Sequence, residues 1–243
     1  MSGDGLGLVE ERNELWYDCS ILTDPVVRLL MKSLADIQKV HHRSTLPGTP
    51  EPAWEVALLF PPQGQWSEED YLALETNRLV EYNNGSIEVL PMPTLTHQRI
   101  VLAFIKLLLA YLSEHPVGEF FPAPVRLRLR EGRYREPDLV FVSDIHASWK
   151  HEQYLSGADW VLEVVSPDDP ARDYVVKRRE YAEAGVPEYW IVDPEKMLIL
   201  VLTLADEGVY REAGVFRPGE TAVSSVLDGF RVAVSQALLQ DQK

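Results

Sequence analysis

Two apolar segments each carry one acidic residue, and these segments constrain the fold more than any other feature of the sequence. Asp138 opens the run LVFV at 139–142, and Glu163 lies inside the run WVLEVV at 160–165. Runs that are apolar at nearly every position are typical of strands covered on both faces, so we expect both segments in the centre of a sheet. A buried carboxylate costs on the order of several kcal/mol unless it is paired or binds a metal. The sequence therefore predicts that the two acids share a metal ion.

The length and composition are those of an ordinary globular protein. A chain of 243 residues with 46% hydrophobic and 25% charged residues is long enough for one or two domains. Residues 1–65 differ from the remainder, with a glycine-rich start and a proline-rich connector. We interpret them as an N-terminal extension, and we expect the main domain in residues 66–243.

Cysteine usage and hydropathy predict a cytoplasmic protein. Cys19 is the only cysteine, which excludes an intramolecular disulfide and a zinc site built from several cysteines. The N-terminus lacks the basic start and apolar core of a signal peptide. The longest apolar stretch, residues 100–112, contains Lys106 and is shorter than a bilayer span. We therefore expect a soluble protein with no membrane partner.

The charge is unevenly distributed along the chain. The net charge of −15, from 23 Lys+Arg against 38 Asp+Glu, argues against a general nucleic-acid coat protein. Residues 126–135, however, have the sequence RLRLREGRYR. Arg126, Arg128 and Arg130 alternate with apolar residues, so we expect them on one face of a strand, where they can hold a nucleic-acid backbone. A solvated face without a ligand is the alternative interpretation.

Local signals predict a mixed order of helices and strands. Capping residues and periodicity indicate a short helix after Ser67, a buried helix that begins after Thr94 or Thr96 and ends before Pro116, and a helix from Pro170 to Gly185 capped by Asp169. Turn residues indicate hairpins that turn at residues 84–85, 131–132 and 194–196. The C-terminal tail is expected to hold a strand pair and a short helix. We therefore predict an α/β protein, formally α+β, with a central mixed sheet flanked by helices.

The two strand acids are suited to a hard cation. Neighbouring strands lie about 4.8 Å apart, so carboxylates that are level with each other, such as those of Asp138 and Glu163, can reach one ion. Mg²⁺ prefers oxygen ligands and usually takes one or two protein carboxylates. A hydrolase also needs a positive group near the reacting phosphate. The strand of Glu163 offers only Val165 two residues later on the same face.

The following helix supplies the positive group. Asp173, Lys177 and Tyr181 have the spacing i, i+4, i+8, so they share one helix face. Because this helix starts directly beyond the strand of Glu163, Lys177 can lean over the strand end. Asp173 and Tyr181 are expected to support the site.

These motifs resemble those of a known family. They are Pro137-Asp138, Glu163-x-Val165 followed by Ser166-Pro167, the helical trio of Asp173, Lys177 and Tyr181, and AGVPEYWIVDP at 184–194. Over about residues 65 to 235 the chain resembles the Uma-two family of restriction endonuclease-like proteins, which belongs to the PD-(D/E)XK nuclease superfamily. The resemblance implies a restriction-endonuclease-like core in which the catalytic lysine has moved from the strand to the next helix.

The resemblance also implies roles for two earlier residues. The family has a glutamate in a Tyr-Glu-Leu segment before a glycine turn, and a histidine that opens the first long helix. These correspond to Glu81, before Gly85, and to His97. Val80 and Tyr82 flank Glu81 here, so the first correspondence departs from the family pattern.

The resemblance and the residues together predict an endonuclease that hydrolyses DNA with Mg²⁺, or with Mn²⁺ in its place. Asp138 and Glu163 are expected to hold the metal, and Lys177 to orient the attacking water or stabilise the transition state. Glu81 is expected to position a second metal or the helix, and His97 to contact phosphate. A homodimer is expected, because two sites related by a twofold axis suit the cutting of both strands.

Two other classes of function remain open from the sequence. One is a non-catalytic module that keeps the nuclease fold and binds nucleic acid or protein, which the acidic net charge favours. The other is a hydrolase or transferase that acts on a small phosphorylated molecule. The presence of all three of Asp138, Glu163 and Lys177 favours the enzyme.

Overall fold

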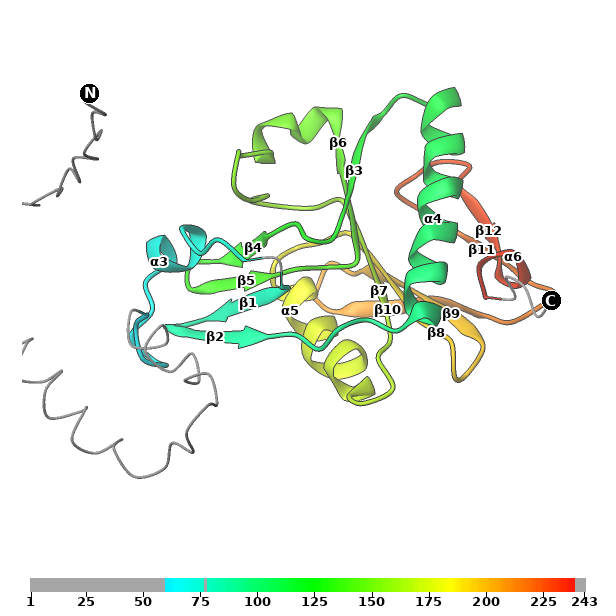
Figure 1. Cartoon of the computed structure of the whole chain (residues 1–243). Helices are drawn as coiled ribbons and strands as arrows, with labels where there is room; N and C mark the ends of the chain where they lie inside the picture. Colours follow the sequence, from blue (N-terminus) through cyan, green and yellow to red (C-terminus); the bar gives the residue numbers. More distant parts are fainter. Residues whose placement is uncertain (1–59, 77, 239–243) are drawn as a thin grey trace, which may run out of the picture. The chain divides into compact units, whose positions relative to one another are not determined.

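A six-stranded mixed sheet forms the centre of the molecule (Figure 1). The computed structural model describes residues 60–76 and 78–238. In spatial order the strands of the sheet are β10 (Tyr210–Phe216), β9 (Leu198–Leu204), β8 (Glu188–Asp193), β7 (Trp160–Val164), β6 (Leu139–Ser143) and β3 (Gly118–Pro122). β7 and β8 run parallel, and the other neighbours pair antiparallel. The two apolar strands expected at the centre are β6 and β7, so the predicted central mixed sheet is confirmed.

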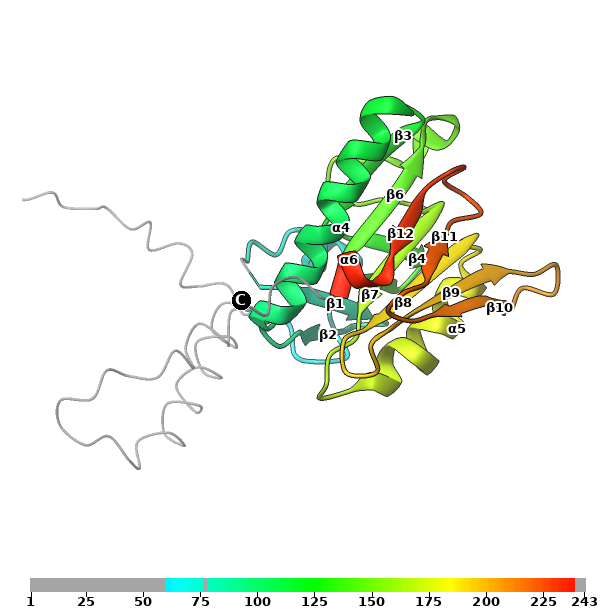
Figure 2. The ribbon, with the colours of Figure 1, turned by 90° about the vertical axis from the view of Figure 1, so that its right-hand side faces the viewer.

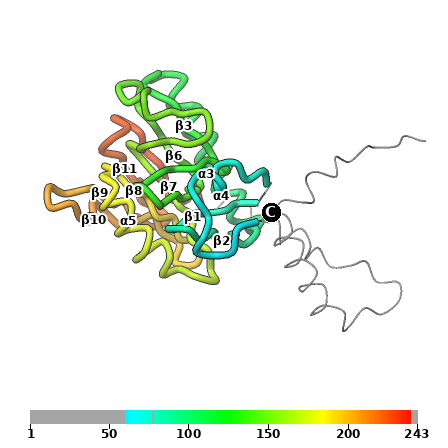
Figure 3. The backbone as a smooth tube through the Cα atoms, turned by 90° about the vertical axis from the view of Figure 1, so that its left-hand side faces the viewer, coloured from blue at the N-terminus to red at the C-terminus, as the bar shows by residue number. Residues whose placement is uncertain are grey.

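Four further strands form a separate antiparallel sheet. Figure 3 views the molecule from the side on which β1 and β2 of this sheet lie. Their order is β2 (Ser86–Val89), β1 (Val80–Asn83), β5 (Arg133–Arg135) and β4 (Leu127–Arg130). The turn between β1 and β2 falls at Asn84 and Gly85, with φ values of 43° and 85°. This left-handed backbone is what the Asn-Gly pair predicts. Local signals predicted both hairpins, but not their union through β1 and β5.

Two helices begin where their capping residues predict. Ser67 and Asp70 form a reciprocal capping box at α3 (Glu68–Leu72), and the side chain of Thr94 caps α4 (Leu95–Glu114). The remaining elements are the 3₁₀ helix η2 (Asp144–Trp149), the π-helix η3 (Arg172–Lys177), α5 (Arg178–Glu183), the strand pair β11 (Thr221–Val223) and β12 (Arg231–Ala233), and α6 (Val234–Leu238).

Helices cover both faces of the six-stranded sheet (Figure 2). On one face, α4 and α6 pack with Phe104 and Leu108 fully buried against Trp190. The rings of Phe104 and Trp190 meet edge-on, with centroids 6.2 Å apart and planes at 88°. On the other face, Tyr181 of α5 packs against Tyr189 of β8. Glu163 and its partner Tyr181 lie on this second face, because Glu163 alternates along β7 with Leu162 and Val164, which pack against the first face.

α4 is longer than the apolar stretch in the sequence indicated. Its 20 residues have a hydropathy of 1.4 over the most apolar window, which is enough to cross a membrane by length and composition alone. The expectation that this segment is too short to span was therefore wrong. Only 28% of that window is buried, but Ile100, Phe104 and Leu108 belong to the main core. A core helix meets the same criterion, so one such helix is weak evidence for a membrane span.

A compact unit of the chain begins at Pro61. Gln63 exchanges two side-chain hydrogen bonds with the backbone of Ile87, at 2.9 and 2.8 Å, and Gly64 N donates to Gly85 O at 2.7 Å. Residues just before the predicted boundary at 65–66 thus join the hairpin of β1 and β2. Most of the predicted N-terminal extension, including Cys19, lies outside the described residues.

Candidate active site

Asp138 and Glu163 are brought together by the register of two neighbouring strands. β6 pairs with β7 so that Leu139 faces Leu162, and continuing this ladder by one residue places Asp138 opposite Glu163. Val164 N donates to Asp138 Oδ2 at 2.7 Å, which fixes the aspartate at the strand entrance. Both carboxyl groups are buried and line the same pocket. The sequence placed these two acids on adjacent central strands, and the structure has them there.

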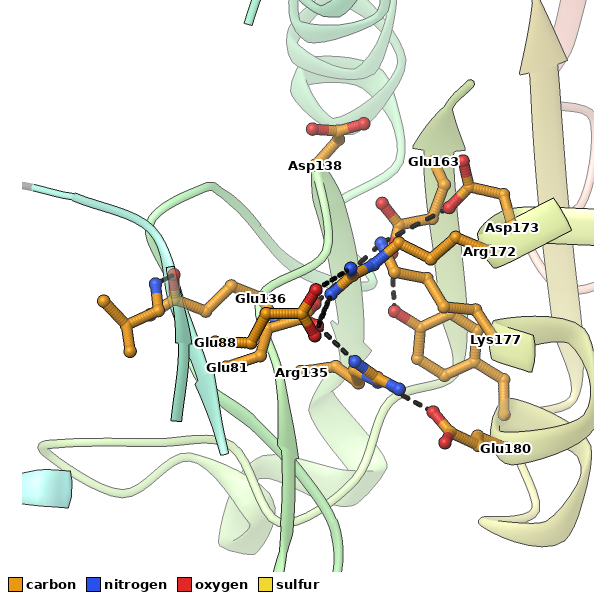
Figure 4. Close-up of polar contacts among 12 residues, drawn as sticks. Glu81, Glu88, Arg135, Glu136, Asp138, Glu163, Arg172, Asp173, Lys177 and Glu180 are labelled. Carbon is orange, nitrogen blue, oxygen red and sulfur yellow. Dashed lines mark hydrogen bonds and ion pairs between the residues drawn. The ribbon is translucent and has the colours of Figure 1, made fainter. Parts of the chain in front are cut away.

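The helix after β7 directs three side chains at Glu163. Lys177 Nζ lies 2.8 Å from Glu163 Oε1 and 3.4 Å from Asp173 Oδ1. Tyr181 donates its hydroxyl hydrogen to Glu163 Oε1 at 2.6 Å. Lys177 is only 4% exposed, so its ammonium points inward. Figure 4 shows Lys177, Asp173 and Glu163 converging, and this is the face that the i, i+4, i+8 spacing predicted.

A π-helical segment supplies the part of the helix that bears Lys177. Helical backbone runs from Pro170 to Glu183, but residues 172–177 have π geometry. Gly185, with φ of 77°, ends the helix as expected. π segments are rare in proteins, and those that occur are often found at functional sites. The sequence predicted a regular helix here, because no local residue signal distinguishes a π segment from an α-helix.

Glu81 is the centre of a buried ion-pair cluster. It is 2% exposed and contacts the guanidinium groups of Arg135 and Arg172, while its Oε1 lies 3.9 Å from Lys177 Nζ. Burial favours the neutral acid, but the positive charges of Lys177, Arg135 and Arg172 outweigh burial and lower the pKa of Glu81. Glu81 does not line the pocket. In this structure it holds the basic side chains of the site in place.

Arg172 and Arg135 are site residues that the sequence reasoning missed. Arg172 bridges Glu81 of β1 and Glu88 of β2, with Nη1 2.5 Å from Glu88 Oε1. Arg135 Nε lies 2.7 Å from Glu180 Oε2. Arg172 directly precedes Asp173, and Arg135 lies two residues before the Pro137-Asp138 motif, which is a weak signal. Their partners lie 45 or more positions away in sequence, so spacing alone does not reveal them.

His97 lies in the first turn of α4 and contacts the aspartate. Its Nε2 is 3.1 Å from Asp138 Oδ2, and its Nδ1 is buried with no hydrogen-bond partner among the described residues. Burial lowers the pKa of His97, but the hydrogen bond and charge of Asp138 outweigh burial and raise the pKa above its usual value. His97 therefore orients Asp138 at the edge of the pocket.

The pocket that these residues surround has a volume of about 230 Å³ and a surplus of acids. Its lining side chains come from β2 and the loop after it, from α4, from the ends of β6 and β7, and from the start of the next helix. The lining residues are Leu79, Glu88, Leu90, Pro91, Pro93, His97, Glu136, Asp138, Glu163, Val164, Ser166, Asp168, Asp169, Arg172, Asp173 and Lys177. Seven of them are acids, against one arginine and one lysine. The charge balance therefore suits a cation.

The acids of the pocket resist ionisation in each other's presence. Burial raises the pKa of Glu163 to about 8, and the charge of Asp138 adds to this although Lys177 opposes it. Burial also raises the pKa of Asp173. Burial raises the pKa of Glu136 to about 7, against a hydrogen bond from Val80 N. A bound cation relieves this unfavourable concentration of negative charge.

The donor set fits Mg²⁺ or a similar hard ion. Among the described residues, no three or more His, Cys, Asp or Glu side chains are grouped so as to hold a metal. Mg²⁺ needs fewer, since it usually takes one or two carboxylates and keeps several waters. Asp138 uses Oδ2 and Glu163 uses Oε1 for their contacts. One oxygen of each carboxylate thus accepts nothing from the described residues and suits a cation.

The alternating arginines in and just before β4 are mostly used within the fold. Arg126 donates to two carbonyl groups at the C-terminal end of α3, at 2.9 and 3.1 Å. Arg128 Nη2 lies 3.1 Å from Glu68 Oε2 of the same helix. Among the described residues, Arg130 donates to the neighbouring carbonyl of Glu131 alone, and it is exposed. The expected solvent-facing strip is therefore covered by α3 at two of its three positions.

Comparison with known proteins gives the family. A family model described as "Uma2: Putative restriction endonuclease" matches residues 68–235. The chain belongs to the Uma2 family. The matched Uma2 segment contains both large sheets, the pocket and all of the predicted site residues, so the resemblance seen in the sequence is confirmed.

A solved structure shares the fold of this Uma2 domain. It is the crystal structure of a protein described as a putative nuclease belonging to DUF820 from Anabaena variabilis ATCC 29413. The TM-score is 0.59, with 18% sequence identity over 72% of this chain and 98% of that chain. At this identity the likeness shows the nuclease-like fold alone. No curated protein matches the chain.

Proposed function

We propose that this Uma2 protein is an endonuclease that hydrolyses DNA phosphodiester bonds with Mg²⁺, for which Mn²⁺ can substitute. The observation that carries the proposal is the buried ammonium of Lys177, held 2.8 Å from Glu163 in the pocket that Asp138 also lines. A lysine charge beside two carboxylates with unused oxygens serves no evident packing purpose. The family description supports a nuclease.

Each residue has a role that follows from its contacts. Asp138 and Glu163 would hold Mg²⁺, which supplies a Lewis acid and lowers the pKa of a bound water. Lys177 places a fixed positive charge where the transferring phosphoryl group gains negative charge. His97 keeps the Asp138 carboxylate in one orientation. Glu81 anchors the cations around the site.

The assembly and location follow from the substrate. A homodimer places two sites about a twofold axis, and this arrangement suits cleavage of both strands of a duplex. The protein is expected in the cytoplasm, with access to DNA.

The test is incubation of the purified full chain with supercoiled and linear DNA in Mg²⁺, Mn²⁺ or EDTA. We expect cleavage with either metal, none in EDTA, and at least about a hundredfold lower rates for Asp138→Asn and for Glu163→Gln, because each removes a metal ligand. Glu207→Gln is the control, since Glu207 is an exposed acid distant in the fold from the pocket. DNA binding without cleavage under any metal would identify a non-catalytic module instead.

A further inference from the structure

A second pocket lies beside the β4–β5 hairpin and α5. It has a volume of about 210 Å³. Arginines dominate its polar lining, which consists of Leu129, Arg130, Arg133, Arg179, Glu180, Glu183 and Ala184. None of these residues lines the candidate active pocket. We call this site the basic pocket.

The arginines of the basic pocket keep unused hydrogen-bonding capacity. Arg133 pairs with Glu180 at 3.2 Å, but its Nε is buried with no partner among the described residues. Arg130 donates to one backbone carbonyl at 3.0 Å. Arg179 has a side chain that is 69% exposed and lies 3.7 Å from Glu183. A guanidinium has five N–H donors, so several remain for a ligand.

The acids nearby do not neutralise this cluster. Glu180 is shared between Arg133 and Arg135, and Arg135 also contacts Glu81. Burial lowers the pKa of Arg133, and the neighbouring charges of Arg135 and Arg130 lower it further, although Glu180 opposes this. A surplus of positive charge is thus concentrated at one place on a chain with a net charge of −15.

We infer that the basic pocket binds a phosphate group, and that during the proposed reaction this group is a backbone phosphate of the DNA. The planar fork of arginine matches phosphate oxygens in a bidentate manner. That the phosphate belongs to DNA rests on the proposed function. That the pocket binds a phosphate at all rests on the arginines of the pocket alone. It also relocates the backbone contact from Arg126 and Arg128, which α3 engages, to Arg130, Arg133 and Arg179.

An ion-pair chain links the basic pocket to the candidate active site. Arg133 contacts Glu180, which contacts Arg135, which contacts Glu81. Arg133 and Arg135 are two residues apart on β5, a separation of about 7 Å. Glu81 in turn lies 3.9 Å from Lys177, which lines the candidate active pocket. Buried ion pairs thus connect the two pockets through the protein interior.

The test compares two arginines in matched surroundings. Arg179 and Arg211 have side chains that are each 69% exposed, and each pairs with a glutamate four residues away on its own segment. Only Arg179 lines the basic pocket. DNA affinity of the full chain is measured against salt concentration in EDTA, so that no cleavage occurs, for Arg179→Gln, Arg130→Gln, their double variant and Arg211→Gln.

Loss of one phosphate contact is expected to lower the salt slope by about one and the affinity at 0.15 M salt by about fivefold. Arg179→Gln and Arg130→Gln are expected to show this, and the double variant about twice the change in slope. Arg211→Gln is expected to bind as the wild type does. Equal effects of Arg179→Gln and Arg211→Gln would overturn the assignment to DNA.

Inorganic phosphate separates this inference from the proposed function. At constant ionic strength, replacing chloride with phosphate is expected to raise the melting temperature of the wild type more than that of the double variant, which retains only the general stabilisation by a kosmotropic anion. If the wild type binds no DNA yet shows this difference, the pocket binds free phosphate. The endonuclease proposal is then refuted, whereas the phosphate site is retained. If neither DNA nor phosphate distinguishes the double variant from the wild type, the basic pocket is not a phosphate site.

Discussion

Glu163 and Glu188 are buried glutamates on neighbouring central strands, and the protein stabilises them in opposite ways. Glu163 on β7 is 3% exposed, contacts a lysine ammonium and faces the acidic pocket. Glu188 on β8 is fully buried and lies on the same face of its strand as Trp190. It accepts hydrogen bonds from Trp190 Nε1 at 2.6 Å, Ser224 Oγ at 2.7 Å, Ser225 N at 2.6 Å and the Ser225 hydroxyl.

The difference shows that burial of an acid in an apolar strand does not by itself indicate chemistry. Both oxygens of Glu188 are occupied by neutral donors, and Glu188 lines neither of the two pockets. Its carboxylate ties the chain around Ser224 to the sheet. Glu163 keeps one oxygen without a partner among the described residues and lies near other acids. Unused acceptors, acidic neighbours and access to a pocket distinguish the glutamate that we propose as a metal ligand from the structural one.

Removal of the lysine is expected to have the largest effect on this comparison. Lys177→Met leaves Glu163 in its pocket without the fixed positive charge, so we expect metal binding to persist and the DNA cleavage rate to fall about a hundredfold or more. Single-turnover cleavage and the Mg²⁺-induced shift in melting temperature measure the two properties. Lys196→Met is the control, because Lys196 is 56% exposed and lies 2.9 Å from Asp193 rather than in the pocket. Equal rates in the wild type and Lys177→Met would refute the role of Lys177.

Replacement of each glutamate by glutamine is expected to affect different properties. Glu188→Gln presents an amide NH₂ to groups that are themselves donors, so we expect a loss of about 2 kcal/mol in the free energy of unfolding. Glu163→Gln removes a carboxylate whose pKa is raised by burial to about 8, so we expect its fold stability without metal to be retained. Urea denaturation measures both. Similar losses in the two variants would mean that Glu163 is also a structural residue.

The pH dependence of metal binding is expected to give the smallest and most specific difference. Mg²⁺ needs the Glu163 carboxylate without its proton, and burial raises the pKa of Glu163 to about 8. The Mg²⁺ affinity is therefore expected to rise up to about tenfold per pH unit below this value and to level off above it. Melting temperatures with and without Mg²⁺ between about pH 6 and about pH 9 measure this.

The glutamate variants supply the controls for the pH profile. Glu188→Gln is expected to keep the dependence, because its carboxylate plays no part in metal binding, whereas Glu163→Gln is expected to lose it. A Mg²⁺ affinity that is independent of pH in the wild type would contradict the assignment of Glu163 as a metal ligand.

The parts of the fold that the sequence predicted have local causes. Thr94 caps α4, the Asn84-Gly85 pair closes a hairpin, and the apolar runs after Asp138 and around Glu163 form adjacent strands. Each of these signals lies within a few residues of the element that it specifies. The predicted extension in residues 1–65 and the predicted dimer remain predictions.

The parts that the sequence did not predict depend on contacts between distant segments. Arg126 looked solvent-facing because it alternates with apolar residues, but it donates to the carbonyl of Leu72 at the end of α3 and to that of Leu74 just beyond it, 54 and 52 positions away. Arg135 and Arg172 meet at Glu81 through the second sheet and the helix after β7. Periodicity reports which face of an element a residue occupies. It does not report what covers that face.

Because of the π segment η3, the side chains of the site are positioned by two different elements, the sheet and the helix. The sheet ladder sets the direction of Asp138 and Glu163, whereas the winding of residues 172–177 sets the direction of Lys177. Each residue added to or removed from this segment rotates the rest of the helix about its axis relative to β6 and β7, which precede the segment in sequence. A single-codon insertion or deletion between Pro170 and Lys177 is therefore the shortest genetic change expected to separate the Lys177 ammonium from the two acids that we propose as metal ligands.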